Sequence, residues 1–312
     1  MAYKEFELEL SPYERGMERG EKMADFVEQE VGSLAEMNGL DLGCGSGGIS
    51  LAFGKRCKQL ICGDLLKDRI RLTRERILKH NMYHLFPVQL DSLEICFPDK
   101  TFDFIIMNGL LEWVGTKPGR PSPQYWQLQS LREAHRILKD DGFIYLATEN
   151  RWYPSHFLRD PHVHKPLLAV LPRPMAEKLS QLIWHKPYRV YMHSYWKLDR
   201  LLQKAGFENN RFYFPLFHYH YPYKIVRLDQ PTEILQALRN FPRSDVTQDF
   251  MYQPKSAEGQ KRKLKLNFMK AIVNLRLQKL LAQSFIVICR KQEPHNLANG
   301  RSKEFNYEAH QV

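Results

Sequence analysis

A glycine-rich segment, Leu40 to Gly48, constrains the fold of this chain more than any other part of the sequence. Its pattern is D-x-G-x-G-x-G, beginning at Asp41, and it follows directly on the short apolar end of a strand. Glycine has no Cβ, so the backbone can turn sharply there and approach a bound ligand closely. The spacing is not the G-x-G-x-x-G of dinucleotide-binding loops, and no P-loop Lys-Ser/Thr follows it. The segment therefore predicts a strand, a ligand-binding turn and then a helix, without a pyrophosphate cradle.

Strand and helix patterns alternate along the first half of the chain. A nearly continuous apolar run at 102–107 is typical of a central strand that is covered on both faces. Alternation at these spacings indicates an α/β fold with a parallel sheet built from right-handed crossovers. The expected strands lie at 40–42, 59–62, 87–90, 102–107, 143–148, 207–217 and 284–289, and the expected helices begin near 48 and span 67–80, 124–138, 195–205 and, as a basic amphipathic helix, 261–283.

The composition changes after Asn150, where Pro, His and Trp become frequent and strand patterns fade. We expect this region to be an insertion that covers the substrate. The predicted organisation is an N-terminal helical segment (1–35), a cofactor-binding core (36–150), a substrate-covering insertion (151–206), C-terminal strands with an inserted basic helix (207–291) and a flexible tail (292–312).

An acidic residue, Asp64, stands at the end of the second expected strand, in Ile61-Cys62-Gly63-Asp64. An ionised carboxylate has two acceptor oxygens and can accept hydrogen bonds from both hydroxyls of a ribose. Together with the glycine turn, Asp64 predicts a nucleoside-containing ligand at this edge of the sheet.

These segments resemble the class I S-adenosylmethionine-dependent methyltransferases, and among them the type 11 and type 25 methyltransferase domains. The resemblance covers about residues 36–150 and the two strands at 207–217 and 284–290. Besides the glycine turn and Asp64, it depends on Gln89-Leu90-Asp91-Ser92, on the approach to the fourth strand from Phe97 to Ile106, and on the run His135 to Gly142 before the fifth strand.

The resemblance implies a Rossmann-like, seven-stranded, mostly parallel sheet with helices on both faces and an antiparallel last strand. It also implies S-adenosyl-L-methionine as the cofactor, with Asp91 near the adenine amino group; Asp103 is expected to be a structural acid more than a ligand contact. The residues that we assign to cofactor binding are Asp41, Gly43, Cys44, Gly45, Gly47, Asp64, Leu65, Asp91, Ser92 and Asn108.

The catalytic group is predicted in the segment after the fifth strand, a position that overlooks the methyl group in this family. The candidates are Glu149, His162 and His164. Histidine suits proton removal near neutral pH because its ordinary pKa is about 6.5. The two histidines could instead ligate a metal or have a purely structural role, but no third clustered ligand is visible, and we predict no metal.

The methyl acceptor is left open by the sequence. Asn108-Gly109-Leu110-Leu111 is not the Asn-Pro-Pro-Tyr motif used on planar amino groups, which argues against an adenine N6 methylase. The segment with Asp160-Pro161-His162 has a looser resemblance to methyltransferases of bacterial glycan and lipopolysaccharide assembly, which suggests a small-molecule or saccharide hydroxyl.

The formal net charge of +11 keeps other partners open, namely RNA or protein as an acceptor and peripheral contact with a membrane. A catalytically silent cofactor-binding subunit is a third hypothesis, which the intact glycine turn disfavours. The basic helix at 261–283 could contact phosphates or simply pack as an amphipathic helix, and the aromatic run from Phe212 to Tyr221 could form sheet core or line a pocket. The five cysteines are scattered, and no apolar run is long enough to span a membrane, so we expect reduced thiols and a cytoplasmic location.

Overall fold

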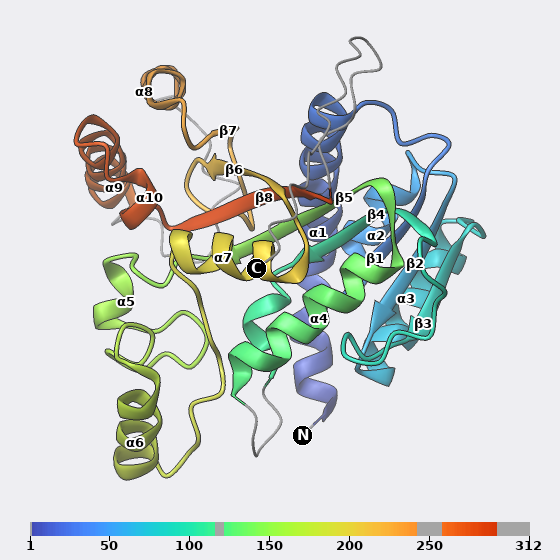
Figure 1. The fold of residues 1–312 in the computed structure, drawn as a ribbon, viewed down its shortest axis with the longest axis horizontal. Coiled ribbons are helices and arrows are strands. Elements are labelled where there is room, and N and C mark those ends of the chain that lie inside the picture. The colour runs from blue at the N-terminus through green and yellow to red at the C-terminus, as the bar shows by residue number, and fades with distance from the viewer. Residues whose placement is uncertain (1, 116–121, 242–257, 292–312) are drawn as a thin grey trace, which may run out of the picture.

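A single mixed β-sheet forms the centre of the molecule (Figure 1). The computed structural model describes residues 2–115, 122–241 and 258–291, with side chains from Gly16 onward in the first range and from Lys263 onward in the last. The strand order is β3-β2-β1-β4-β5-β8-β6-β7. The strands are β1 (Asn38–Leu42), β2 (Gln59–Asp64), β3 (Leu85–Gln89), β4 (Phe102–Asn108), β5 (Leu138–Glu149), β6 (Asn209–Pro215), β7 (Ile225–Arg227) and β8 (Ser284–Arg290).

The predicted α/β fold with a mostly parallel sheet and an antiparallel last strand is confirmed. Strands β1 to β5 pair in parallel, and β8 runs antiparallel to β5 from Glu149↔Ser284 to Phe143↔Arg290. The prediction of seven strands is wrong, because the described part of the chain has eight. The additional strand, β7, is three residues long and pairs with β6 at the sheet edge. Such a short segment cannot show the alternation from which a strand is predicted.

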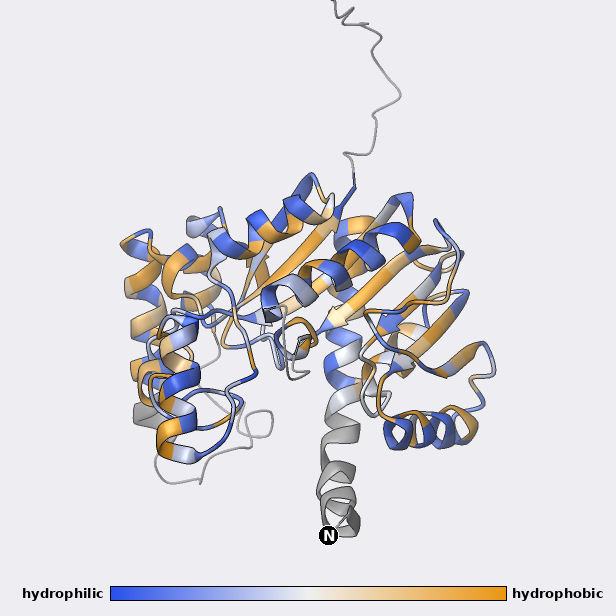
Figure 2. Ribbon diagram, turned by 60° about the horizontal axis from the view of Figure 1, so that its bottom comes forward, coloured by the Kyte–Doolittle hydropathy of each residue, from blue (hydrophilic) through white to orange (hydrophobic). Residues whose placement is uncertain are grey.

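Helices cover both faces of the sheet, as the strand sequences require (Figure 2). Successive residues of β4 point to opposite faces: Phe104 and Ile106 pack with helices α1 to α3, whereas Ile105 and Met107 pack with α4, α7, α8 and α9. The helices are α1 (Ala2–Val31), α2 (Gly48–Gly54), α3 (Lys67–Lys79), the 3₁₀ turn η1 (Leu111–Trp113), α4 (Pro123–Ile137), α5 (Ser155–Leu158), α6 (Arg173–Trp184), α7 (Tyr195–Ala205), α8 (Pro231–Arg239), α9 (Glu258–Asn274) and α10 (Gln278–Leu281).

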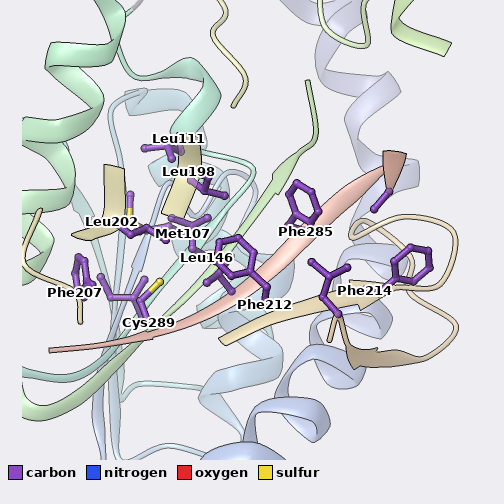
Figure 3. Close-up of a cluster of buried hydrophobic side chains, with 14 of the residues drawn as sticks. Met107, Leu111, Leu146, Leu198, Leu202, Phe207, Phe212, Phe214, Phe285 and Cys289 are labelled. Carbon is purple, nitrogen blue, oxygen red and sulfur yellow. The ribbon is translucent and has the colours of Figure 1, made fainter. Parts of the chain in front are cut away.

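The larger of the two buried layers is rich in aromatic side chains (Figure 3). Phe212 and Phe214 of β6 and Phe285 of β8 lie in this layer, and Leu198 of α7 packs on the same face of the sheet. The first part of the aromatic run, with Phe212 and Phe214, therefore forms sheet core, which is one of the two interpretations given for this run above. Later members of the run have a different environment, described below.

The basic amphipathic helix predicted at 261–283 is interrupted in the structure. Helix α9 ends at Asn274, Arg276 has a φ of 58°, and the short α10 follows. A positive φ at a residue with a Cβ is incompatible with a continuing helix. The segment therefore turns before it reaches β8.

Residues 151–190 form a protruding lobe with a small core of its own, which we call the lobe (Figure 1). It contains α5 and α6, and Leu168, Ala176, Tyr188 and Val190 are buried in its centre. Arg151 attaches the lobe to the end of β5, since its guanidinium donates to the carbonyl oxygens of residues 170 and 171. The domain boundaries predicted from the sequence remain a proposal.

All five cysteines lie in the described ranges and are free thiols, as expected. In the ranges that the structure covers, no helix is both long and apolar enough to cross a membrane. The predicted flexible tail, 292–312, falls outside the described residues.

Candidate functional site

The glycine segment forms a tight turn between β1 and α2. Gly43, Gly45 and Gly47 have φ values of 84°, 57° and 81°, a region that residues with a Cβ rarely adopt. The amides of Gly43 and Cys44 donate to the carbonyl of Gly63 on β2, at 2.8 and 2.9 Å. A Cβ placed on Gly45 would meet no atom within 4 Å, so this side of the turn is open. The turn has the shape of a cradle that a ligand can approach.

The carboxylate of Asp64 lies beside this turn at the end of β2 and is buried. Its Oδ2 accepts the amide of Gly45 at 2.9 Å and its Oδ1 accepts the amide of Leu66 at 3.0 Å. Each oxygen has a further lone pair. Asp64 can therefore hold the glycine turn and accept two hydroxyl donors from a ligand at the same time.

Three other predicted cofactor residues line up along the same edge. Leu65, next to Asp64, is 53% exposed and offers an apolar surface. Asp91 and Ser92 follow β3 and are half-buried, and Asp91 Oδ1 accepts the amide of Leu93 at 3.0 Å. Because β1, β2 and β3 are parallel neighbours, their carboxyl ends meet at one edge of the sheet.

Asn108 ends β4, the neighbour of β1 on its other side. Its Oδ1 is buried and has no hydrogen-bond partner among the residues that the structure describes. Leu110 lies two residues later. If Gly43 had a Cβ, the nearest atom to it would be Cδ1 of Leu110, at 2.9 Å. The segment after β4 therefore packs against the glycine turn, with an unsatisfied acceptor at its start.

Asp41 and Cys44 are buried inside the turn. Asp41 accepts the hydroxyl of Ser50 at 2.6 Å, and burial raises the pKa of its carboxyl to about 7. Burial also raises the pKa of the Cys44 thiol well above its usual value, so Cys44 is a space-filling thiol and not a nucleophile. Arg19 of α1 was not predicted; it is electrostatically coupled to Asp41, and its Nε is buried without a partner in the described part of the chain.

A second polar group lies beyond the ends of β4 and β5, and we call it the glutamate–histidine cluster. It contains two buried glutamates, and the members contact one another through side chains. Its residues are Glu112, Glu149, His156, His162, His218, Tyr219 and His220.

Glu112, in the 3₁₀ turn after β4, is the centre of one half of this cluster. Its side chain is fully buried; Oε2 accepts the hydroxyl of Thr148 at 3.0 Å and Oε1 accepts the phenol of Tyr219 at 3.3 Å. Oε1 also lies 3.7 Å from Nε2 of His162. Neither Glu112 nor Tyr219 was predicted from the sequence.

His162 reaches this carboxylate because Asp160 shapes its loop. The buried Asp160 accepts the amides of His162 and Val163 at 2.8 and 2.9 Å, and the phenol of Tyr188 at 2.8 Å. The His162 ring packs edge-on against Trp113, with 4.9 Å between ring centroids. Its Nδ1 is buried and has no partner within the described residues.

Two opposing effects act on the pKa of His162. Burial favours the neutral ring, but the adjacent carboxylate of Glu112 and the charges of Glu149 and Asp160 outweigh it and raise the pKa above its ordinary value. A histidine with a carboxylate 3.7 Å from Nε2 and no described partner at Nδ1 is a candidate for a general base.

Glu149, at the end of β5, is the centre of the other half. Its Oε1 lies 3.4 Å from Nε2 of His218 and its Oε2 lies 3.7 Å from Nε2 of His156. Burial would raise its pKa, but the hydrogen bond from His218 and the nearby His162 and His156 lower it below its usual range. Glu149 is thus a buried carboxylate that stays ionised.

The side-chain atoms of Glu149, His218 and His220 lie within 4.8 Å of one another, a spacing at which three ligands could hold a metal ion. The hydrogen bonds argue against this. Nδ1 of His218 accepts the backbone amide of His220 at 3.1 Å, and Nδ1 of His220 faces the guanidinium of Arg19, which can only donate, at 2.9 Å. Both neutral rings therefore carry their proton on Nε2, and they offer N–H donors where a metal would need lone pairs.

The structure thus brings two of the three predicted catalytic candidates, Glu149 and His162, into one cluster. The third, His164, is exposed, has a φ of 58° and lies outside it. His218, Tyr219 and His220 belong to the aromatic run from Phe212, so this later part of the run lies in the cluster.

Comparisons with known proteins find methyltransferases. Residues 40–146 match the methyltransferase domain family. A demethylmenaquinone methyltransferase of Alkalihalophilus pseudofirmus is 24% identical over 173 residues, which cover 54% of this chain and 69% of that protein. An uncharacterized methyltransferase of Schizosaccharomyces pombe is 28% identical over 133 residues, 42% of this chain and 49% of that protein. A solved methyltransferase of Aquifex aeolicus superposes with a TM-score of 0.41 and 19% identity, over 63% of this chain and 84% of that one.

The match of residues 40–146 to the methyltransferase domain family, together with the glycine turn and Asp64, supports a class I S-adenosylmethionine-dependent methyltransferase as the class of this chain. Its cofactor is S-adenosylmethionine. The open side of the turn at Gly45 and the buried acceptors of Asp64 and Asn108 fit the nucleoside and amino-acid parts of such a molecule.

Proposed function

We propose that the chain transfers a methyl group to a hydroxyl of a small molecule or saccharide, with His162 as the general base. The single observation that carries this proposal is the Glu112–His162 pair: the carboxylate lies at Nε2, and Nδ1 is buried without a described partner. A neutral hydroxyl is a weak nucleophile, and its attack requires that its proton be taken up. His162 Nδ1 is the atom that we propose to accept it.

The bound cofactor supplies an electrophilic methyl group on a sulfonium. We propose that Asp64 holds the ribose, that Asp91 and Leu65 border the adenine, and that Asn108 contacts the part of the cofactor nearest β4. The glycine turn and the segment after β4 contact each other through Gly43 and Leu110. Leu110 stands two residues before Glu112, so this contact supports the assignment of the glutamate–histidine cluster to the acceptor.

Glu149 has a separate role in this proposal. It stays ionised beside His156, His162 and His218, and after proton transfer its charge stabilises the imidazolium form of His162. We therefore assign Glu149 as a positioning and charge-stabilising residue. His164 has no role in the proposed reaction.

Nucleic acid is less well supported as the acceptor. Binding along a nucleic-acid backbone requires basic side chains on a continuous path into the site. The basic helix α3 lies at one end of the molecule, whereas the basic residues of the lobe and of α9 lie at the other (Figure 1). This separation favours a small acceptor.

The test begins with methyl-labelled S-adenosylmethionine and fractionated saccharides and small metabolites, followed by identification of the labelled atom. On the acceptor so found, His162→Ala should lower kcat by about 10²- to 10⁴-fold, the range for loss of a general base, and leave cofactor affinity unchanged. His185→Asn is the matched control, because His185 is an exposed histidine of the same lobe. Label appearing on RNA or protein, or unaltered turnover of His162→Ala, would contradict the proposal.

The pH profile gives a second readout. Because His162 must be neutral to accept a proton, kcat should rise with pH through a pKa above the ordinary value of about 6.5. Glu112→Gln removes the charge that raises this pKa, so the rising limb should move to lower pH. Five titratable groups interact electrostatically with His162 and so affect its pKa. They are Glu112 from η1, Glu149 from β5, Asp160 from its own loop, His156 from α5 and His220 from the loop after β6.

A further inference from the structure

The lobe exposes large aliphatic side chains that its own core does not need. Leu158 in α5 is 82% exposed, and Leu182 and Met175 in α6 are 71% and 56% exposed. Ile183 and Leu167 are exposed as well. Single exposed apolar residues are ordinary on protein surfaces, but several on one small lobe indicate a surface that contacts something else.

Helix α6 shows this most clearly, because it is apolar on two sides. Its inner side buries Ala176 and Ser180 against the core of the lobe. Met175 and Leu182 are seven residues apart, so they lie above one another on the same side of the helix, and that side is exposed. A helix that only covered its own lobe would carry polar residues there.

The charges around these side chains have one sign. Residues 151–190 contain seven Lys or Arg and only two acidic residues. Of the two, Asp160 is fully buried and Glu177 pairs with Arg173 at 2.7 Å. The exposed Lys178 follows Met175 by three residues on α6, and Lys186 follows its C-terminus. The apolar surface is therefore bordered by positive charge.

We propose that the outer surface of the lobe, formed by α5 and α6, docks on an anionic phospholipid membrane. A helix with aliphatic residues on one side and lysines beside them suits the interface, where the aliphatic groups enter the acyl region and the lysines reach the headgroups. A second copy of the chain would bring two positive lobes together, which disfavours a symmetric dimer through this surface. Binding to a nucleic-acid backbone would not bury the exposed aliphatic side chains in an apolar environment.

Sedimentation of the full-length chain with lipid vesicles tests the proposal. The protein should bind vesicles that contain phosphatidylglycerol and bind much less to vesicles of phosphatidylcholine alone, with binding that weakens as salt is raised. Leu182→Asp should reduce partitioning onto anionic vesicles by about tenfold or more, since burying a leucine side chain contributes on that scale. The double variant Lys178→Glu, Lys186→Glu should remove the preference for anionic lipid.

Leu78→Asp serves as the matched control, because Leu78 is 52% exposed and belongs to α3, a helix that lies far from α5 and α6 in Figure 1. It should bind vesicles like the unaltered protein. Calorimetric titration with S-adenosylhomocysteine shows that each variant is folded, independently of the acceptor. Equal binding of Leu182→Asp and Leu78→Asp would overturn the proposal. So would an absence of binding to anionic vesicles, or a dimer in solution that Leu182→Asp dissociates.

Discussion

Replacing Asp64 by asparagine tests the proposed cofactor contacts most directly. The carboxylate accepts the amide of Gly45 on Oδ2 and the amide of Leu66 on Oδ1, and the ribose hydroxyls would donate to the same two oxygens. Asparagine keeps one acceptor but places an NH₂ group at the other position, so one amide and one hydroxyl lose their acceptor. A hydrogen bond to a charged group contributes roughly 1.5–3 kcal/mol. Loss of the one to the ribose should weaken S-adenosylmethionine binding by about ten- to a hundredfold.

Part of that loss could come from a disturbed glycine turn, so the assay compares two ligands. S-adenosylhomocysteine and an analogue lacking both ribose hydroxyls are titrated by calorimetry into the unaltered protein and into Asp64→Asn. The unaltered protein should lose affinity when the hydroxyls are removed, and the variant should lose less, because the acceptor of one of the two hydroxyls is already gone. Asp68→Asn, an exposed acid in the first turn of α3, controls for the change in net charge. The same loss of affinity in Asp64→Asn as in the unaltered protein would refute the ribose contact.

Two further predictions concern stability. A Cβ on Gly20 would lie 2.6 Å from that of Ala52, so Gly20→Ala should separate α1 from α2 and lower the free energy of unfolding by about 1–3 kcal/mol. A Cβ on Gly16 would be in ordinary contact at 3.5 Å, so Gly16→Ala should instead raise the free energy of unfolding by up to about 1 kcal/mol. Thermal unfolding of the two variants measures both, and equal effects would contradict the packing argument. Asp41 has a folded pKa raised by burial from 3.8 to about 7, so in the cofactor-free protein it reduces stability increasingly as pH rises through that interval. Asp41→Asn should therefore flatten the dependence of Tm on pH there, and an unchanged slope would show that Asp41 is ionised in the folded chain.

The cofactor half of the site could be predicted because its signals are local in sequence. The glycine turn, Asp64 and Asp91 each stand directly after a strand, and parallel strands bring their carboxyl ends together. Periodicity alone indicated the strands and most of the helices. It failed where tertiary contacts decide, as at β7, and at Arg276, where a left-handed residue ends a helix that the basic pattern continues.

The glutamate–histidine cluster could not be predicted in the same way. Glu112 follows an apolar strand and looks like any first polar residue of a loop, and His218 stands in an aromatic run that reads as sheet core. Their proximity depends on β8 being inserted between β5 and β6, and on the lobe folding back so that His162 reaches Glu112. These are long-range contacts with no periodic pattern in the sequence.

This difference has a consequence for acceptor specificity. The proposed cofactor contacts come from β1 to β4, whereas the cluster draws Glu149 from β5, His162 from the lobe and His218 from the loop after β6. A change in the lobe can therefore reposition His162 without disturbing the glycine turn or Asp64. Cofactor affinity and acceptor choice should then be separable by mutation. Variants of Asp160, which holds the His162 loop through two backbone amides, should raise KM for the acceptor or lower kcat while the Kd of the cofactor stays constant. A parallel loss of cofactor binding in such variants would show that the two halves of the site fold as one unit.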